Sequence, residues 1–465
     1  MSFNQYLKVM KIRKVKWANH PILGNLELDF VNPVTNKPYS TIVLAGENGT
    51  GKTTILETLN TFLSIGSFEP FDGIEYEVED KRYILTPSNI PGSLKTFFTR
   101  YDIENNTSEN IHSDKNNSPD SIHSDNKDPR SYGSVFSRPR ADYKTSKIES
   151  VKTNELDKNK YDSDKDDNFT SLKQLIVDVQ NQDNERYSDI NDERQAQNLP
   201  AMTKGEFEQV SKIYRFKKAF NDFFDKIKYK KVSNQANEKV VLFEKNGVEI
   251  SLDHLSTGEK QIVFRGAYLL KNLSLLNNST IMIDEPELSM HPKWQEKILQ
   301  YYKALFTDNT GNQIVQLFIA THSDHVLKEA FKDQCNTLVV VLNENSGIIQ
   351  SKHIIAPNIL PSITIAETNF LAFDIASNDF HIELYGWLQQ KESLTSIVDT
   401  DNFIISHPLY NPLIHEKIYA HPNGRTTYRA LSTYIRNAID HPSTTTVFSL
   451  DELRTSIELL ISILR

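Results

Sequence analysis

The stretch Ala45-Gly46-Glu47-Asn48-Gly49-Thr50-Gly51-Lys52-Thr53-Thr54 decides the fold of this chain. It matches the pattern G-x-x-x-x-G-K-[ST] at every fixed position. An apolar run, Thr41–Leu44, precedes it, and residues 55–59 continue it with helix-forming side chains. In such a loop, backbone N–H groups and the N-terminus of the following helix point at phosphate oxygens. The sequence therefore predicts a strand, a phosphate-binding loop and a helix in direct succession.

The loop also predicts its ligands. A lysine at the position of Lys52 reaches the β- and γ-phosphates of a nucleotide, and a hydroxyl at Thr53 binds Mg²⁺. We therefore expect ATP and Mg²⁺ to bind here. The expected nucleotide-binding residues are Gly46, Glu47, Asn48, Gly49, Thr50, Gly51, Lys52, Thr53 and Thr54.

A second acidic motif lies at the end of the run Thr280–Ile283, which is apolar enough for a strand covered on both faces. Asp284 and Glu285 follow it. Asp284 would hold Mg²⁺ through water, and Glu285 would orient and deprotonate the water that attacks the nucleotide. The alternative is that they are two surface acids after a buried strand.

The stretch Leu255-Ser256-Thr257-Gly258-Glu259-Lys260-Gln261 opens an apolar helix, Ile262–Leu270. Its serine hydroxyl and glycine N–H can face a phosphate at that helix N-terminus. Taken alone, the same residues are compatible with an ordinary helix cap, in which Ser or Thr is followed by Glu.

Composition limits the other classes of protein. The 465 residues allow two to three domains, and a net charge of −9 argues against general attraction to nucleic acid. The single cysteine, Cys335, excludes an internal disulfide and is typical of a reducing compartment. There is no apolar run of about 18 residues and no apolar signal-peptide core near Met1. We therefore expect a cytoplasmic protein that does not act at a membrane.

We expect an α/β fold with five parts. From 103 to 131 and from 147 to 169, polar residues dominate and cannot bury enough surface to offset their ordering entropy. Helical spacing of apolar residues resumes after 170, and again after about 366. The predicted parts are a head segment with the phosphate loop (1–102), a polar, largely disordered insert with a short strand near 134–140 (103–169), a helical lobe (170–235), a second head segment (236–365) and a helical C-terminal region (366–465).

Together these motifs make residues 6–345 resemble soluble, non-transporter ABC-type ATPases of the RecF/SMC/OLD superfamily. The likeness rests on Leu255–Gln261, on the helix that follows, and on Asp284–Pro292 with Lys293-Trp294-Gln295. Within that superfamily the chain is most similar to AAA_21-type ATPases of bacterial anti-phage defence, above all the Septu (PtuA-like) ATPase, which partners an HNH endonuclease.

The resemblance implies further features of the site. His322, after the run Leu317–Thr321, falls where these ATPases place a switch histidine that contacts the γ-phosphate. Two heads would sandwich two ATP molecules in a homodimer or higher oligomer. Ser256, Thr257, Gly258 and Glu259 would then complete the partner's site. The residue of the glutamine loop stays open between Gln174, Gln180, Gln182 and a turn near Arg138 or Arg140.

The C-terminal region carries a weaker motif. Arg436 and His441 bracket four residues, which resembles the R-x(4–6)-H motif of HEPN ribonucleases, with Glu383 as a candidate third member. In that family the Arg and His attack RNA without a metal. Three interpretations stay open: a structural pair at a helix end, a degenerate HEPN fold that docks a partner, and an active ribonuclease.

Three functions therefore compete. In the first, the chain is a regulatory ATPase that controls a partner nuclease, with an HNH nuclease expected. In the second, it is an ATP-gated ribonuclease similar to anticodon nucleases. In the third, it is a RecF-like DNA-repair ATPase, with nucleic acid as partner. The third is disfavoured because a helical segment of about 60 residues is too short for the long arms of chromosome-structuring ATPases.

Overall fold

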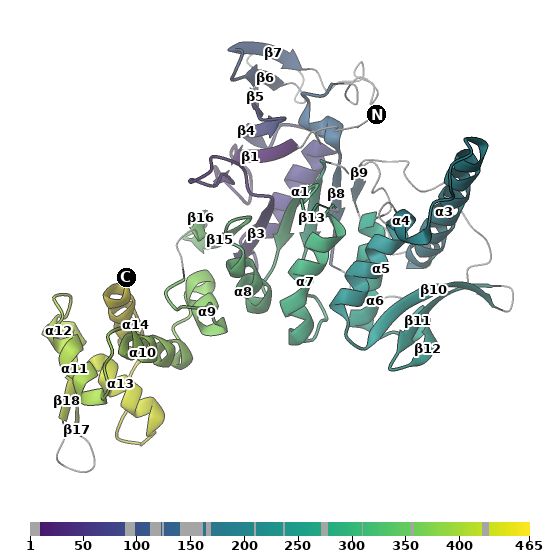
Figure 1. Ribbon diagram of the computed structural model, residues 1–465. Helices are drawn as coiled ribbons and strands as arrows, with labels where there is room; N and C mark the ends of the chain where they lie inside the picture. The colour runs from purple at the N-terminus through teal and green to yellow at the C-terminus, as the bar shows by residue number, and fades with distance from the viewer. Residues whose placement is uncertain are drawn as a thin grey trace. The chain divides into compact units, whose positions relative to one another are not determined.

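The computed structural model forms two compact units, residues 1–353 (unit 1) and 354–465 (unit 2), and each is described by itself (Figure 1). No helix in the described part of the chain is both long and apolar enough to cross a membrane. The structure describes residues 10–88, 98–111, 122, 125–139, 161–163, 169–208, 211–235, 238–270, 278–308, 310–354, 358–420 and 427–465.

Unit 1 is built around a seven-stranded sheet in which β3, β8, β9, β13, β14 and β15 pair in parallel. All residues of β3, β13 and β14 are buried, as the near-continuous apolar runs of a sheet covered on both faces require. In spatial order the strands are β16 (Ile348–Ile354), β15 (Thr337–Asn345), β3 (Thr41–Gly46), β14 (Gln316–Ala320), β13 (Thr280–Asp284), β8 (Ser134–Ser137) and β9 (Tyr161–Ser163).

A second sheet of six antiparallel strands covers the helix α1 (Lys52–Leu63). Phe62 of α1 packs edge-on against Phe68, Phe71 and Phe98. The core between the two sheets also takes Met282 and Phe318 from the parallel sheet. The six strands are, in order, β2 (Glu27–Asp29), β1 (Met10–Trp17), β4 (Phe71–Val78), β5 (Lys81–Pro87), β6 (Phe98–Asp102) and β7 (Thr107–Ile111).

One buried side chain joins the two sheets. Gln316, at the start of β14, accepts a hydrogen bond from Ile12 N (2.7 Å) and donates to Ile12 O (2.9 Å) and Tyr39 O (3.1 Å). Its amide therefore satisfies three backbone groups of the buried residues Ile12 and Tyr39. The parallel sheet and β1 are held at a fixed spacing by this contact.

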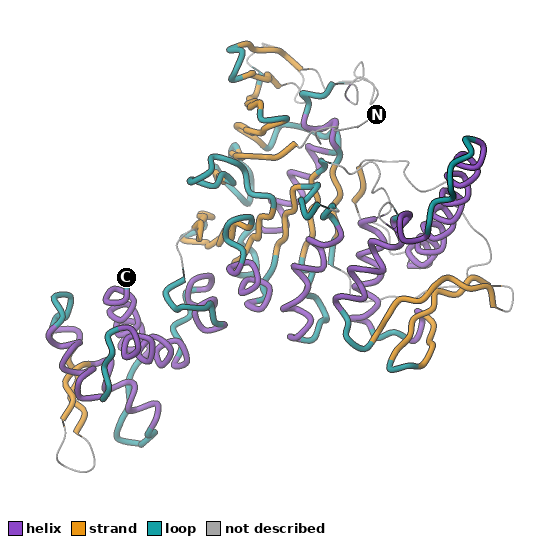
Figure 2. Tube along the Cα trace, viewed as in Figure 1, coloured by secondary structure: helices purple, strands orange, loops and turns teal. Residues whose placement is uncertain are grey.

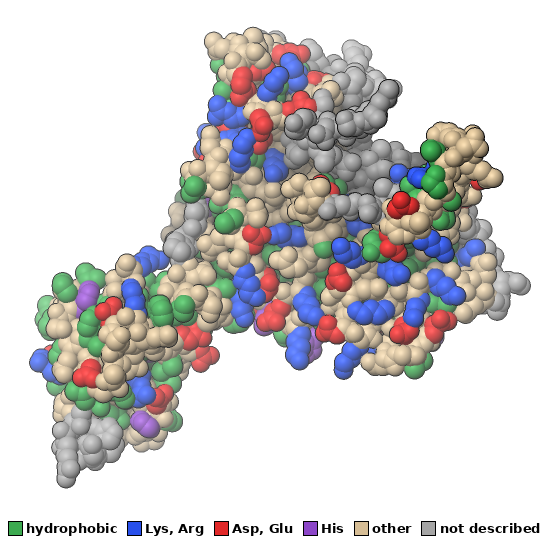
Figure 3. Space-filling view, in the orientation of Figure 1, with side chains coloured by type: hydrophobic (Ala, Val, Ile, Leu, Met, Phe, Trp, Pro, Cys, Tyr) green, Lys and Arg blue, Asp and Glu red, His purple; other side chains and the backbone are tan. Residues whose placement is uncertain are grey.

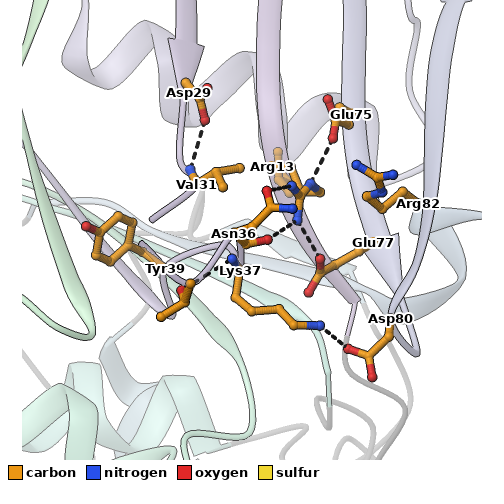
Figure 4. A network of polar contacts seen from close by, with 12 residues as sticks. Arg13, Asp29, Val31, Asn36, Lys37, Tyr39, Glu75, Glu77, Asp80 and Arg82 are labelled. Atoms are coloured by element: carbon orange, nitrogen blue, oxygen red, sulfur yellow. Dashed lines mark hydrogen bonds and ion pairs between the residues drawn. The ribbon is translucent and has the colours of Figure 1, made fainter. Parts of the chain in front are cut away.

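Charged residues fasten the outer part of the six-stranded sheet (Figure 4). The buried guanidinium of Arg13 on β1 bonds Glu75 Oε1 at 2.8 Å and Glu77 Oε2 at 2.7 Å, both on β4. It also donates to the backbone O and the side-chain Oδ1 of Asn36, each at 3.0 Å. One arginine thus fixes the pairing of β1 with β4 and holds the turn at residues 32–38 against them.

Helices and a small antiparallel sheet complete unit 1. A turn at Asn246-Gly247 joins β11 to β12, and both of its residues have positive φ (51° and 81°). Phe216 and Phe220 of α5 are buried, so the aromatic residues of this helix serve packing. The elements are α3 (Phe169–Ala196), α4 (Lys204–Glu208), α5 (Lys212–Phe223), β10 (Ile227–Gln235), β11 (Glu238–Lys245), β12 (Val248–Ser251), η3 (Leu252–His254), α6 (Thr257–Leu270), α7 (Pro292–Leu305) and α8 (Asp324–Lys332).

The predicted α/β fold is confirmed, and so is the short strand predicted near 134–140, which is β8 of the parallel sheet. The prediction that the rest of the insert at 103–169 is largely disordered is wrong for residues 107–111, 129–132 and 161–163, which form β7, the turn η1 (Pro129–Tyr132) and β9. Asp128 orders this turn, because it caps η1 and pairs with the fully buried Arg130 at 2.6 Å. Residues 112–121 and 140–160 of this insert lie outside the described residues.

Unit 2 is mainly helical, as predicted, with one two-stranded sheet (Figure 2). It starts at Ile354, earlier than the expected boundary at residue 366, because Glu367 accepts hydrogen bonds from the N–H groups of Ile359 and Leu360. Its elements are α9 (Ile365–Phe373), α10 (Asn378–Lys391), α11 (Ile397–Ser406), α12 (Pro412–His415), β17 (Glu416–Ala420), β18 (Thr427–Ala430), α13 (Leu431–Asp440) and α14 (Leu450–Leu464).

Replacing the amide that joins the two sheets should destabilise unit 1. Gln316→Leu keeps the side-chain bulk but leaves three buried backbone groups unpaired, which should cost about 2–4 kcal/mol. Thermal and urea unfolding of the purified variant measure this cost. Gln350→Leu, on exposed β16, is the matched control and should unfold like the wild type. Equal unfolding curves for Gln316→Leu and the wild type would contradict this account of the sheet junction.

Candidate functional site

Three neighbouring strands of the parallel sheet end at one edge and bring the predicted motifs together (Figure 1). Leu44 of β3 pairs with Ala320 of β14, and Ala320 pairs with Asp284 of β13. The residues that follow these positions are the loop from Gly46, Glu285 and His322. Ligands of α/β proteins bind at this carboxyl edge.

The loop from Gly46 to Gly51 is shaped by glycine. Gly46, Gly49 and Gly51 have φ of 140°, 87° and 86°, a region that favours glycine. A Cβ on Gly46 would lie 2.2 Å from Leu342 O, and one on Gly51 would lie 2.4 Å from Leu23 Cδ2. A side chain at Gly46 would therefore require a backbone shift, and one at Gly51 would be strained by the positive φ and would displace the Leu23 side chain.

Lys52, the first residue of α1, turns back over this loop. Its ammonium donates to Gly46 O (2.9 Å) and Glu47 O (2.8 Å). Burial lowers the pKa of Lys52 to about 8, although Asp284, Glu285 and Glu287 act in the opposite direction. The ammonium therefore lies inside the loop, next to the N–H groups that begin α1.

Thr53 and Asp284 meet directly. The Thr53 hydroxyl donates to Asp284 Oδ2 at 2.8 Å, and burial raises the pKa of Asp284, an effect that the Thr53 hydrogen bond opposes. A hydroxyl and a carboxylate are hard oxygen ligands of the kind Mg²⁺ takes, usually one or two from the protein beside phosphate and water. The two residues present therefore fit a magnesium ion.

Glu285 and His322 face each other across the end of the sheet. The distance between Glu285 Oε1 and His322 Nε2 is 3.7 Å, too long for a direct hydrogen bond. Burial and the Lys52 charge lower the pKa of His322, against the effects of Asp284 and a backbone hydrogen bond with Gly46. Glu285 has φ of 43°, unusual for a residue with a Cβ, and its N–H is bonded to Ala320 O at 2.9 Å.

A buried arginine not singled out from the sequence holds this acidic pair by its backbone. Arg265 of α6 donates to Glu285 O (2.9 Å), Asp284 O (2.5 Å) and Ser137 O (3.4 Å). The sequence did hold one clue to this role, since Arg265 is the single charged residue in the apolar run 262–270. A guanidinium buried in such a run needs hydrogen-bond acceptors. Arg265 ties α6 to β13 and β8 and supports the unusual backbone at Glu285.

The stretch Ser256–Glu259 forms a capping box at the start of α6. Ser256 N donates to Glu259 Oε2 (2.8 Å), Glu259 N donates to Ser256 Oγ (3.4 Å), and Glu259 also pairs with Lys245 at 2.8 Å. A Cβ on Gly258 would lie 2.9 Å from Ser289 O. These contacts stay within the turn or reach β11 and the segment after β13. The role of Ser256, Thr257, Gly258 and Glu259 in a partner's site stays a prediction.

The three glutamine candidates for the glutamine loop lie on α3. Gln174 donates to Asp178 (2.8 Å), Gln180 bonds Asn184 and Tyr229, and Gln182 accepts from Lys212 (3.0 Å). Arg138 follows β8, the neighbour of β13, and bonds Glu57 Oε1 of α1 at 2.6 Å. The turn near Arg138 is therefore beside the site, while Arg140 lies outside the described residues.

The candidate ribonuclease residues lie in unit 2. Arg436 of α13 pairs with Asp440 (2.7 Å) and donates to Asn437 (3.0 Å), and His441 is the exposed residue that ends α13. Glu383 of α10 accepts from the Thr364 hydroxyl at 2.7 Å. Arg436 and His441 thus share one helix end, while Glu383 bonds the cap of another helix.

The fold and this site define an α/β protein with a phosphate-binding loop. Residues 42–328 match the AAA_21 family model, described as "AAA domain, putative AbiEii toxin, Type IV TA system". This match covers more than half of the chain, and the chain belongs to this family.

Two curated proteins are similar to part of the chain. "Retron Vc95 probable ATPase" of Vibrio cholerae serotype O1 biovar El Tor is 33% identical over 109 residues, 22% of this chain and 19% of that protein. "Retron Ec83 probable ATPase" of Escherichia coli is 32% identical over 95 residues, 18% of this chain and 16% of that protein. The matched segments span less than a fifth of either relative.

Solved structures of SMC heads are similar in fold at low identity. An Smc head bound to the C-terminal winged-helix domain of ScpA shares 11% identity, with a TM-score of 0.40, and the match covers 74% of this chain and 98% of that one. The SMC head from Thermotoga maritima shares 11% identity with a TM-score of 0.34, and the match covers 74% and 99%.

The lowered pKa of Lys52 predicts how ATP affinity depends on pH. The ammonium is charged below about pH 8 and loses its proton above it. Since only the charged form attracts phosphate strongly, affinity should fall about tenfold between pH 7 and pH 9. Titration of a fluorescent ATP analogue at constant Mg²⁺ measures it. Lys52→Arg keeps its charge, so its affinity should not follow this pH dependence. If ATP affinity falls equally with pH in the wild type and in Lys52→Arg, the pH dependence does not come from Lys52.

Proposed function

We propose that the chain binds and slowly hydrolyses ATP as the regulatory subunit of a cytoplasmic anti-phage defence complex that controls a partner nuclease, with an HNH nuclease expected. The observation that carries the ATPase part is the meeting of Thr53, Lys52, Glu285 and His322 around Asp284 at one sheet edge. The AAA_21 family and two relatives named as probable ATPases support it. The defence role rests on the resemblance of the motifs to Septu-type ATPases.

Each residue has a distinct part in the proposed reaction. The amides of Gly46–Thr54 and the Lys52 ammonium bind the phosphates and orient the γ-phosphoryl group. Glu285 takes a proton from the attacking water, and neutral His322, which follows the neighbouring strand β14, contacts the γ-phosphate. Thr53 and Asp284 would hold Mg²⁺, which would supply positive charge against the phosphates.

We propose that two copies complete each site. Ser256 and Gly258 would present a hydroxyl and an N–H to the nucleotide held by the partner copy, at the N-terminus of α6. ATP would then stabilise the dimer, and hydrolysis would release it. Such coupling makes the ATPase a switch of the assembly's shape.

Unit 2 is the proposed dock for the nuclease. Several apolar side chains in its second half are exposed. Val447 lies near β17, because Lys417 of β17 donates to Val447 O at 3.0 Å. Exposed apolar side chains that lie together often mark protein–protein contacts. On the face of unit 1 drawn in Figure 3, Lys and Arg side chains lie among Asp and Glu side chains. The exposed residues are Leu409, Leu413, Ile414, Ile418, Val447 and Leu450.

Removal of the proposed base should separate binding from hydrolysis. Glu285→Gln should lower ATP turnover by roughly 100-fold or more, while the dissociation constant for ATP changes less than about threefold. With ATP and Mg²⁺, this variant should accumulate as a dimer by light scattering. Glu296→Gln on α7, a partly exposed acid, is the control and should behave like the wild type. Turnover that survives in Glu285→Gln would contradict the assigned base.

The nuclease partner is tested by purifying the tagged chain from its native operon. A stoichiometric nuclease subunit should co-purify, and Leu413→Asp with Ile418→Asp should release it without loss of ATP binding. A chain that purifies as a homo-oligomer alone would contradict the proposal and turn attention to Arg436 and His441.

The alternative function is an ATP-gated ribonuclease, favoured by the one observation that Arg436 and His441 share a helix end. Asp440 neutralises Arg436 there, which argues against it. Arg436→Ala with His441→Ala should leave phage defence and RNA integrity assays at wild-type level if the nuclease is a separate subunit. Loss of defence together with loss of RNA cleavage in that double variant would establish the ribonuclease. ATP-stimulated DNA binding by the purified chain would instead favour a RecF-like DNA-repair role.

A further inference from the structure

Glu287, two residues past Glu285, has no part in the proposed reaction. Its buried carboxylate nevertheless contacts residues 321–323, the segment that carries His322 and is called the switch segment below. Its Oε1 accepts hydrogen bonds from the Thr321 hydroxyl (2.6 Å) and from the backbone N–H of His322 (2.9 Å). Burial raises the pKa of Glu287, against these two hydrogen bonds. A side chain from the segment after β13 therefore fixes the backbone of the residue after β14.

A second anchor holds the same segment from the other side. Gln295 of α7 accepts from Ser323 Oγ (2.6 Å) and donates to Met290 O (3.0 Å). Ser323 N also donates to Thr321 Oγ1 at 3.0 Å. Residues 321–323 are thus bound both to the segment after β13 and to α7, so the backbone at His322 has little freedom.

The turn that carries Glu287 is itself unusual. Glu285 and Ser289 both have positive φ, 43° and 59°, although neither is glycine. Such backbone persists only where surrounding contacts over-determine it. The Glu287 carboxylate supplies two of those contacts, and Arg265 supplies another at Glu285 O. The turn and the switch segment therefore hold each other in place.

We propose that Glu287 is the positioning residue of His322: through Thr321 and the His322 N–H it holds the imidazole opposite Glu285 and the phosphate loop. This inference rests on the proposed function, because His322 matters only if it meets the γ-phosphate. A direct role for Glu287 as base or metal ligand is disfavoured, since its Oε1 faces β14 and already accepts two hydrogen bonds.

The kinetic test uses Glu287→Ala and Glu287→Gln, each alone and combined with His322→Ala. Glu287→Ala should lower kcat for ATP roughly 10- to 100-fold and leave KM within about threefold. Glu287→Gln should retain more activity because its amide oxygen still accepts a hydrogen bond. In the His322→Ala background, Glu287→Ala should lower kcat by less than about a further twofold, because both substitutions remove the same contribution of His322. An equal loss with and without His322 would overturn the proposal.

Thr321 offers variants with less risk to folding. Thr321→Val removes the hydroxyl that donates to Glu287, and Thr321→Ser keeps it. Thr321→Val should reproduce part of the kcat loss, and Thr321→Ser should act like the wild type. Equal kcat in all three proteins, with Glu287→Ala also active, would overturn the proposal.

A measurement that needs no ATP hydrolysis separates this inference from the proposed function. In the full chain with ¹³C-labelled histidine, the His322 signal is assigned by its loss in His322→Ala. Glu287→Ala should shift that signal, whereas the control Glu296→Gln, which borders His325 instead, should not. A shifted signal in a chain without ATPase activity would keep the positioning role and reject the proposed function. If the chain hydrolyses ATP but Glu287→Ala changes neither the His322 signal nor kcat, the positioning role is rejected and the proposed function is kept.

Discussion

The in-register parallel pairing of β3, β14 and β13 is the constraint on which the site depends. Because the pairs Leu44–Ala320 and Ala320–Asp284 lie side by side, the phosphate loop, the acidic pair and the histidine start from one line across the sheet. A shift of one strand by a residue would turn each following side chain to the opposite face. The hydrogen bond of Gln316 to Ile12 and Tyr39 locks the outer layer against this same strand β14.

Much of the head could be predicted because its signals are local. The loop Gly46–Thr54 requires glycine where φ is positive, and the buried runs at 41–44, 280–283 and 317–320 are continuous. The strand predicted near 134–140 is present as β8, whereas the ordered turn η1 before it was missed because its support is distant in sequence: Arg130 lies over the rings of Phe62 and Phe98. Composition over a window of 60 residues hides ordered elements as short as η1 and β7.

The supporting residues of the site could not be predicted for a related reason. Arg265, Glu287 and Gln295 each bond a backbone group outside their own element, at Glu285 O, His322 N and Met290 O, so their sequence context shows no partner. Arg265 lies in the helix α6 and Glu287 in the turn after β13, and neither belongs to a sequence motif that names its hydrogen-bond partner. Their function appears only once the acceptors and donors are placed, because a buried charge must find them.

These contacts also explain how one edge can respond to a nucleotide as a unit. Lys52 bonds two carbonyls of its own loop, and Thr53 bonds Asp284, so phosphate and Mg²⁺ would compete for groups that already have partners. Arg265 donates hydrogen bonds to the backbone oxygens of both Asp284 and Glu285. Glu287, in the turn that follows, accepts a hydrogen bond from the N–H of His322. These hydrogen bonds connect α1, the turn after β13 and the residues after β14, and α6, which carries Arg265, begins directly after Ser256.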